Sequence, residues 1–303
     1  MNIEWAWLRN TTRVAEAEDA IALEGAARCR VLLFHGLTGT PTEFAFVARF
    51  MHRRGQISVE RPRLANHGQP IAVLARTRWG EILSAARRDL SAASERAKRD
   101  RAILVVGGLS LGAILSLILA AERPKDVAGV MALSPTLFYD GWNVPWSRRL
   151  IGLADYLPLK HFIYLRESPP YGFKDAGLRE QIAATYERAR LKDDGDTTEL
   201  GYAHFPLRLF CEIRHLIALC RRTLPSVRAP LLLLQAEEDD ATSPRNAHYI
   251  LEKVGSHSTK LVMLANSYHV ITADLDRAEV AAAMTQFCLS LLARPTDVEA
   301  SHA

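Results

Sequence analysis

Residues 103–121 read ILVVGGLSLGAILSLILAA, and this stretch decides the fold of the chain. Its apolar start, Ile103–Val106, predicts a buried strand, and the run from Ser110 to Ala121 predicts a helix. Gly108-Leu109-Ser110-Leu111-Gly112 lies between them, so the serine falls on a sharp turn from strand to helix. The two glycines let strand and helix approach each other, and the helix N-terminus favours developing negative charge. The stretch predicts that Ser110 is a nucleophile; the alternative is a glycine-rich turn with an incidental serine.

Apolar strands and longer helical segments alternate along the chain on both sides of this stretch. Alternation of this kind predicts the α/β class, with a mostly parallel central sheet that is flanked by helices on both faces. The expected strands are residues 31–34, 56–61, 103–106, 127–133, 231–234 and 261–264. The expected helices of this core are residues 42–54, 79–99, 110–121, 245–254 and 277–292.

The alternation breaks between residues 135 and 228, where tyrosine, tryptophan and proline are frequent. Helical spacing is visible in residues 210–219, so we expect this region to be an inserted, mainly helical cap. The core would then consist of residues 1–134 and 229–303. The aromatic stretch from Phe138 to Trp146 either lines an apolar acyl or aryl pocket or packs the cap onto the core.

The composition of the 303 residues is that of an ordinary globular protein, with 49% hydrophobic and 24% charged residues. The net charge of +4 is small, and the basic residues are not interleaved with aromatic ones, so nucleic acid is not an expected partner. The four cysteines form no Cys-x-x-Cys pair, and no His-x-His or His-Glu-x-x-His motif occurs, so we expect no metal site.

The longest apolar stretch, Ala113–Ala121, is too short to cross a bilayer, which takes about 20 residues. No stable membrane insertion is therefore expected. The first residues lack a basic segment followed by an apolar one, the pattern of a secretory signal peptide. We expect a cytoplasmic protein whose cysteines are buried free thiols.

A glycine-rich loop, His35-Gly36-Leu37-Thr38-Gly39-Thr40-Pro41, follows the first expected strand. A loop in this position can turn a backbone N–H towards the substrate of the nucleophile. The N–H of Leu37 and the N–H of Leu111 would then form a two-donor oxyanion hole, with Gly36 in a supporting role. We expect His35 to support the loop and not to act as a base. The alternative is a glycine-rich turn that only serves packing.

Candidates for the acid and the base follow the last two expected strands. Glu237-Glu238-Asp239-Asp240 comes shortly after residues 231–234, and a carboxylate there can hold a histidine in the right tautomer. Asp239 is our choice and Asp240 the alternative. His269 follows residues 261–264 and has this strand-end position alone among the candidate bases, so we predict it as the base.

Three segments resemble bacterial carboxylesterases of the α/β-hydrolase superfamily, and the similarity extends to the monoacylglycerol lipase-like group. They are residues 34–40, 108–112 and 266–272, within a similarity that covers about 28–134 and 228–292. The resemblance implies the α/β-hydrolase fold, the chain order Ser110, Asp239, His269, a cap over an acyl pocket and no cofactor. It also implies an acid thirty residues before the histidine, which fits Asp239, whereas Asp240 misses by one. Asn66 departs from the glycine that related sequences often carry there.

These residues together predict a serine hydrolase that cleaves carboxylic esters with short to medium acyl chains through an acyl-enzyme on Ser110. A thioesterase, an amidase or peptidase, or an acyltransferase would use the same triad, so the sequence does not separate them. A non-catalytic binding protein of this fold is the other class, and such proteins usually lack a triad member. We expect a small-molecule ester as the partner and a monomer or homodimer.

Overall fold

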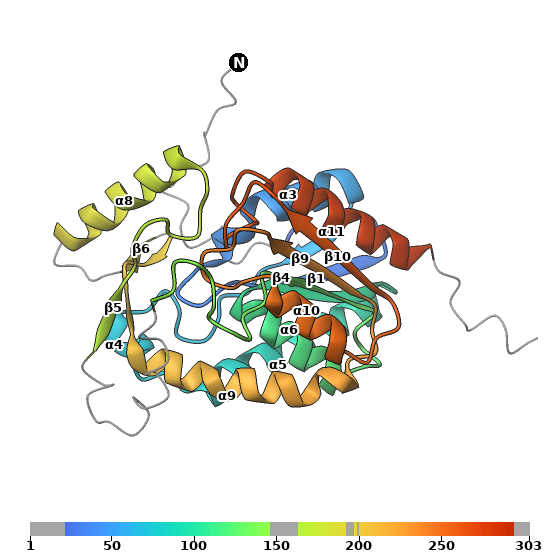
Figure 1. Ribbon diagram of the computed structural model, residues 1–303. Coiled ribbons are helices and arrows are strands. Elements are labelled where there is room, and N and C mark those ends of the chain that lie inside the picture. The colour runs from blue at the N-terminus through green and yellow to red at the C-terminus, as the bar shows by residue number, and fades with distance from the viewer. Residues whose placement is uncertain (1–21, 146–162, 192–196, 199, 294–303) are drawn as a thin grey trace, which may run out of the picture.

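The computed structural model describes residues 22–145, 163–191, 197–198 and 200–293 (Figure 1). Six strands form one sheet in the order β10-β9-β4-β3-β1-β2, and every neighbouring pair is parallel. All six overlap the strands expected from the sequence, five of them apolar runs and one, residues 56–61, an alternating segment. Their bounds are β1 (Cys29–Phe34), β2 (Ser58–Glu60), β3 (Ile103–Leu109), β4 (Gly129–Leu133), β9 (Leu231–Ala236) and β10 (Thr259–Leu264).

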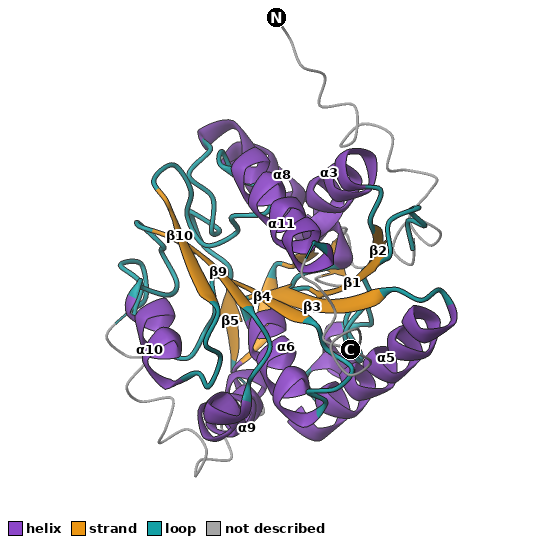
Figure 2. Ribbon diagram, turned by 90° about the vertical axis from the view of Figure 1, so that its right-hand side faces the viewer, coloured by secondary structure: helices purple, strands orange, loops and turns teal. Residues whose placement is uncertain are grey.

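Helices cover both faces of this sheet (Figure 2). Helices α3 (Ala45–Gly55) and α11 (Arg277–Leu292) pack together on one face. The other face carries α5 (Trp79–Arg99), α6 (Leu111–Glu122), α9 (Leu207–Thr223) and α10 (Arg245–Lys253). Shorter helical turns are η2 (Pro41–Phe44), α4 (Ile71–Leu74) and η5 (Leu224–Ser226). The predicted fold class, a parallel sheet between two layers of helices, is therefore confirmed.

Two hydrophobic cores lie on the two faces because successive side chains of a strand point in opposite directions. In β1, Val31 and Leu33 face the core under α3 and α11, whereas Leu32 and Phe34 face the core under α5, α6 and α9. All six residues of β1 are buried. A strand that is buried on both faces needs a continuous apolar run, and this is why a strand such as β1 can be predicted from the sequence.

Helix α6 is apolar all round, and ten of its residues are buried. A helix of this kind must be covered on every side. The sheet covers one side of α6, and α9 and α5 cover the others. Leu209, Ile213 and Leu216 of α9 are buried in the same core as the sheet residues. Helix α9 therefore belongs to the helical layer beneath the sheet, although it lies within the region predicted as a cap.

The rest of the described insertion stands at one end of the molecule, beside the sheet (Figure 1). It contains α8 (Ala176–Leu191) and the short strands β5 (Tyr164–Arg166), β6 (Thr197–Thr198), β7 (Gly201–Tyr202) and β8 (His204–Pro206). The strands form two small antiparallel pairs, β5 with β8 and β6 with β7. Trp146, the last residue of the predicted aromatic stretch, lies outside the described residues. The boundaries of the predicted cap remain a prediction.

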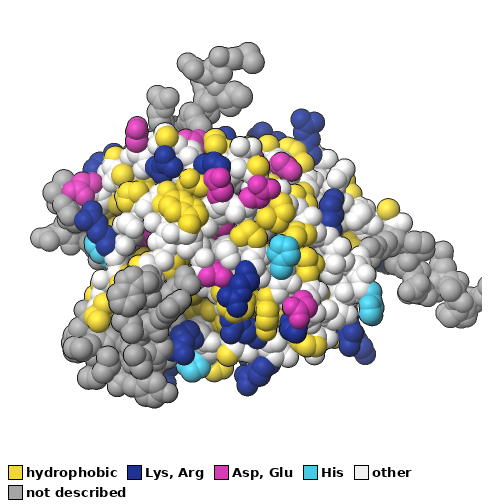
Figure 3. All heavy atoms as spheres, viewed as in Figure 1, with side chains coloured by type: hydrophobic (Ala, Val, Ile, Leu, Met, Phe, Trp, Pro, Cys, Tyr) yellow, Lys and Arg dark blue, Asp and Glu magenta, His cyan; other side chains and the backbone are white. Residues whose placement is uncertain are grey.

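No helix in the described ranges is long and apolar enough to cross a membrane. Acidic and basic side chains are mixed on the face shown in Figure 3, and hydrophobic side chains lie between them.

Candidate active site

The predicted functional residues gather at one edge of the sheet because all six strands are parallel. Each lies just beyond the carboxyl end of a strand: His35 after β1, Ser110 after β3, Asp239 after β9 and His269 after β10. This edge is where α/β proteins bind their ligands. Residues that are more than a hundred positions apart in the sequence are thereby brought to one place.

Ser110 occupies the turn between β3 and α6 with a φ of 57° and a ψ of −111°. A positive φ costs a residue other than glycine about 1–3 kcal/mol, so the surrounding structure must hold it. Its N–H donates to the carbonyl of Leu133 at 2.9 Å. The turn also needs glycine on both sides: a Cβ on Gly112 would lie 1.8 Å from the Phe34 carbonyl oxygen, and one on Gly108 would lie 2.3 Å from the backbone of Gly112.

His269 is held by Asp239. Its Nδ1 lies 3.0 Å from both carboxylate oxygens of Asp239. Asp239 is buried and also accepts hydrogen bonds from the side chain of Gln235 and from the amides of Ala241 and Thr242 at 2.8–2.9 Å. The Thr242 hydroxyl adds one more at 3.1 Å. In the neutral ring this arrangement keeps the proton on Nδ1, which leaves Nε2 as the nitrogen that can accept one.

Asp240 has a different place. One of its carboxylate oxygens accepts the backbone N–H of His269 at 3.2 Å, and none of its described contacts reaches the imidazole nitrogens. Burial raises the pKa of Asp240, the charge of His269 opposes this rise, and the charge of Asp239 adds to it. The geometry therefore separates the two candidate acids: Asp239 faces the ring, and Asp240 holds the backbone of the loop that carries it.

The charges around His269 favour its protonated form. Burial alone would lower the pKa of the imidazole, but the charge and hydrogen bond of Asp239 and the charges of Asp240 and Glu43 together outweigh it. The result is a pKa of about 9. An imidazolium formed by taking a proton from a nucleophile would thus be stabilised at this position.

The loop after β1 supplies the second predicted amide. Within the described residues, neither the N–H of Leu37 nor that of Leu111 donates a hydrogen bond, so both are available to a substrate oxygen. His35 ties the loop down: its Nδ1 donates to the Gly36 carbonyl at 2.8 Å, and its Nε2 accepts the N–H of Leu64 at 3.0 Å. Burial lowers the pKa of His35 to about 3, so the ring is neutral and serves as a support.

Sequence reasoning missed Thr136. Its hydroxyl forms a hydrogen bond of 2.8 Å with Ser110 Oγ, and no described hydrogen bond joins Ser110 to His269 in this structure. Thr136 follows β4, which lies directly beside β3 in the sheet. Strand order is not written in the sequence, so the only available signal was a hydroxyl residue shortly after a strand.

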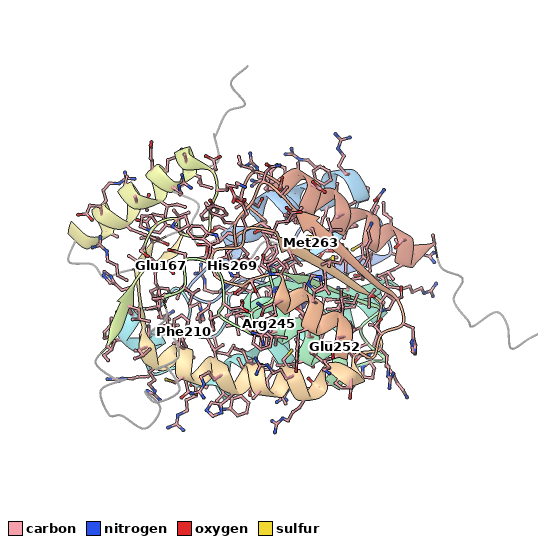
Figure 4. The ribbon with its side chains drawn as sticks, in the orientation of Figure 1. Glu167, Phe210, Arg245, Glu252, Met263 and His269 are labelled. Carbon is pink, nitrogen blue, oxygen red and sulfur yellow. The ribbon has the colours of Figure 1, made fainter. Side chains whose placement is uncertain are left out.

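Part of the insertion closes over the histidine. The amide of Val270 donates to the Gly172 carbonyl at 2.9 Å, and a Cβ on Gly172 would lie 3.5 Å from His269 Cβ. Glu167 lies beside His269 in Figure 4, and burial raises the pKa of its carboxyl to about 7. Neither Gly172 nor Glu167 was singled out in the sequence.

The aromatic residues at 138–139 pack the insertion onto the core. Phe138 and Tyr139 pack against the core beneath the sheet. The ring of Tyr139 lies 5.3 Å from that of Phe210 at the start of α9. Trp142 is 59% exposed, and its indole N–H donates to the Glu238 carbonyl. In the described part of the chain, no group of three or more His, Cys, Asp or Glu side chains could hold a metal ion.

A parallel sheet between helical layers, with a serine on a strained strand-to-helix turn, defines an α/β hydrolase. The chain belongs to the serine aminopeptidase S33 family, whose model matches residues 25–276. This family confirms the resemblance stated from the sequence.

Relatives with assigned activities match over most of their length. A thermostable monoacylglycerol lipase of Bacillus sp. strain H-257 is 26% identical over 82% of this chain and 85% of its own. A carboxylesterase of Bacillus subtilis is 23% identical over 82% of this chain and 87% of its own.

Solved structures of lipolytic enzymes share the fold of this chain. A metagenome-derived lipolytic enzyme superposes with a TM-score of 0.71 at 26% identity, over 90% of this chain and 97% of its own. A monoglyceride lipase of Saccharomyces cerevisiae shares the fold, with a TM-score of 0.74 at 13% identity over 89% of each chain. The protein is a carboxylic-ester hydrolase.

Proposed function

We propose that this enzyme hydrolyses small carboxylic esters through an acyl-enzyme on Ser110, with His269 as the general base and Asp239 as its orienting acid. The observation that carries the proposal is the pairing of His269 Nδ1 with both oxygens of Asp239 at 3.0 Å. This pairing stands at the same sheet edge as a serine held at a φ of 57°. The combination supports nucleophilic acyl transfer.

The reaction proceeds in two halves. Ser110 Oγ attacks the ester carbonyl carbon while His269 Nε2 takes the hydroxyl proton, and the carbonyl oxygen becomes an oxyanion. The amides of Leu37 and Leu111 donate hydrogen bonds to that oxygen. The intermediate then collapses: the bond to the alcohol oxygen breaks, and His269 gives its proton to the leaving alcohol. Water attacks the acyl-enzyme by the same route and releases the carboxylic acid and free Ser110.

Before the attack, the Ser110 hydroxyl must leave Thr136, with which it forms a hydrogen bond in this structure. In the proposed mechanism, a rotation about the Cα–Cβ bond of Ser110 turns the hydroxyl from Thr136 towards His269. A neutral hydrogen bond contributes about 0.5–1.5 kcal/mol net, so this step adds little to the barrier.

The proposed substrates are esters with short to medium acyl chains. The relatives named as monoacylglycerol lipase and carboxylesterase support this class, since this chain covers most of their length. Thioesters, amides and acyl transfer to an alcohol use the same acyl-enzyme. They are the other outcomes of the substrate test below.

The test joins labelling with turnover. The enzyme is treated with a fluorophosphonate probe, and the labelled peptide is identified by mass spectrometry. We expect the label on Ser110, and no label on Ser110→Ala. Turnover is then compared among p-nitrophenyl esters from acetate to laurate, acyl-CoA thioesters and aminoacyl amides. The highest kcat/KM is expected among the esters with short to medium chains. A folded wild-type protein that is labelled elsewhere, or turns over no ester, would refute the proposal.

We further propose that the enzyme acts in the cytoplasm as a monomer or homodimer. Cell fractionation with a detergent-free wash tests the location, and light scattering coupled to size-exclusion chromatography tests the assembly. Recovery in a membrane or secreted fraction, or a larger assembly, would contradict these expectations.

A further inference from the structure

A half-buried carboxylate lies inside the loop after β1 and is not used by the mechanism above. Glu43 lies on the helical turn η2, and its side chain turns back towards β1. Its Oε2 accepts the N–H of Gly36 at 2.8 Å. Gly36 directly precedes Leu37, whose N–H is the proposed donor to the oxyanion. The carboxylate therefore holds the peptide next to the one that acts on the substrate.

The loop is shaped around this carboxylate. A Cβ on Gly39 would lie 1.7 Å from Glu43 Oε1, so a larger residue there would displace the Glu43 carboxylate from this position. A Cβ on Gly36 would lie 3.5–3.6 Å from both Glu43 oxygens and 3.6 Å from Ser110 Cβ. Gly36 is thus packed between the carboxylate and the nucleophile. The N–H of Gly39 also donates to the Gly36 carbonyl at 3.3 Å, which closes the turn around Glu43.

Glu43 also acts on the histidine by its charge. Burial raises the pKa of Glu43 to about 7, and the Gly36 amide and the charge of His269 oppose this rise. The charge of Glu43 in turn raises the pKa of His269. The other groups that face His269 are the carboxyls of Asp239, Asp240 and Glu167. The phenol of Tyr186 on α8 faces both Glu43 and Glu167, and Tyr171 faces Tyr186.

We propose that Glu43 is a positioning residue that holds the 36–39 loop against Ser110 and adds a further negative charge to those that face His269. The inference rests on the proposed function, because it assigns Glu43 to the oxyanion donor Leu37 and to the base His269. It adds a carboxylate outside the Ser110, Asp239, His269 set. Without the acceptor at Glu43, the Gly36 amide loses its partner, and the following amide is no longer aimed at one point.

Two variants separate the hydrogen bond from the charge. Glu43→Gln keeps an oxygen that can accept the Gly36 N–H but removes the charge, whereas Glu43→Ala removes both. Glu81→Ala is the matched control, because Glu81 Oε2 accepts the Arg78 N–H at 2.7 Å at the start of α5, where it is exposed to solvent. Far-ultraviolet circular dichroism and a thermal melt show whether each variant folds.

The readouts are kcat, KM and the pH dependence of kcat/KM on a p-nitrophenyl ester, with fluorophosphonate labelling of Ser110 in each protein. For Glu43→Ala we expect kcat to fall about 10- to 100-fold and KM to change less than about threefold, because the oxyanion contact forms mainly in the transition state. Glu43→Gln should recover kcat to within about fivefold of wild type at its own optimum. In both variants the pKa that describes the acid side of the kcat/KM profile, assigned to His269, should fall by about 0.5 unit or more, since a negative charge near His269 is lost.

Three results would overturn the proposal. One is a folded Glu43→Ala whose kcat and acid limb match those of wild type and Glu81→Ala. Another is a Glu43→Gln as impaired as Glu43→Ala at every pH, because the shared acceptor would then do nothing. The third is a wild-type enzyme that is not labelled on Ser110. This last result refutes the proposed function itself and removes Glu43's role with it, whereas the first two leave the labelling of Ser110 intact.

Discussion

The substitution Asp239→Asn tests the assignment of the acid. Two carboxylate oxygens of Asp239 receive five donors: the side chain of Gln235, the amides of Ala241 and Thr242, the hydroxyl of Thr242, and His269 Nδ1. An asparagine offers one oxygen and a group that only donates, so at least one of these donors faces another donor. If the asparagine amide faces the ring, Nδ1 must accept and the proton moves to Nε2, which can then no longer take the proton of Ser110.

The magnitude follows from the two effects. The pKa of His269 is about 9 against an ordinary 6.5, so its surroundings favour the imidazolium by about 3 kcal/mol, a factor of about 300. Asp239 is the largest favourable contribution to this shift. The wrong tautomer adds a further loss, and the corresponding change in a serine protease lowers kcat about 10⁴-fold. We expect kcat/KM to fall about 10³- to 10⁴-fold in Asp239→Asn.

Asp240→Asn is the matched control, because Asp240 is the other candidate for the triad acid. The carboxylate of Asp240 accepts the backbone N–H of His269, and an asparagine oxygen can do the same. We expect a loss of less than about tenfold. The assay is kcat/KM on a p-nitrophenyl ester, with thermal melts to show that both variants fold. The reasoning fails if Asp240→Asn is impaired as severely as Asp239→Asn.

Three further predictions concern residues around the nucleophile. In Thr136→Val the Ser110 hydroxyl no longer has a partner to leave, so the acylation burst should become up to about fivefold faster. In Gly112→Ala the new Cβ meets backbone, so the free energy of unfolding should fall by about 3 kcal/mol or more, whereas Gly80→Ala, with nothing within 4 Å, should be neutral or stabilising by up to about 1 kcal/mol. Folding raises the pKa of Glu43 from 4.5 to about 7, so the free energy of unfolding of the wild type should fall as the pH rises through that range. Glu43→Gln has no such group, so its free energy of unfolding should rise relative to that of the wild type, by up to about 3 kcal/mol at pH 7.

The measurements are stopped-flow bursts for Thr136→Val, urea unfolding for the glycine variants and melts across pH for Glu43→Gln. A burst slowed tenfold or more would show that Thr136 holds Ser110 in the attacking orientation. Equal stabilities of Gly112→Ala and Gly80→Ala would contradict the tight contact at Phe34. A difference between Glu43→Gln and wild type that does not change with pH would mean that the Glu43 carboxyl is not raised in pKa by folding.

The sheet could be predicted because its chemistry is local. Strands β1, β3, β4 and β9 are buried on both faces and appear as short apolar runs, and the helices between them have their own periodicity. The two edge strands give weaker signals, because β2 alternates and β10 is buried only at Leu264. The candidate site followed from the same pattern. In a parallel sheet every carboxyl end lies at one edge, so a serine, a carboxylate and a histidine after three different strands had to converge there.

Other parts of the site depend on contacts that a sequence does not encode locally. Thr136 reaches Ser110 only because β4 lies next to β3, and the order of strands is a tertiary property. Glu43 sits in a first helical turn, where an acidic residue is ordinary, and nothing local tells that it folds back onto Gly36. The antiparallel pair of β5 and β8 joins Tyr164 to Pro206 and has no local signal either.

The place of helix α9 in the molecule also depends on contacts outside its own segment. Its apolar residues recur every three or four positions, which suits a helix that lies on any apolar surface. Only the neighbouring α6, which is apolar all round, reveals that α9 must cover it. The apolar faces of α6 and α9 are visible in their own segments, but only the packing of α9 on α6 decides where α9 lies.

The position of α9 sets a limit on how this enzyme can be recombined with its relatives. Exchanging all of residues 135–228 would remove the cover from α6 and leave a wide apolar surface in contact with water, where it would promote aggregation. An exchange that begins after Tyr139 and stops before α9 keeps both helical layers complete. The portion of the insertion that can be replaced as a module therefore ends at Pro206, where β8 meets α9.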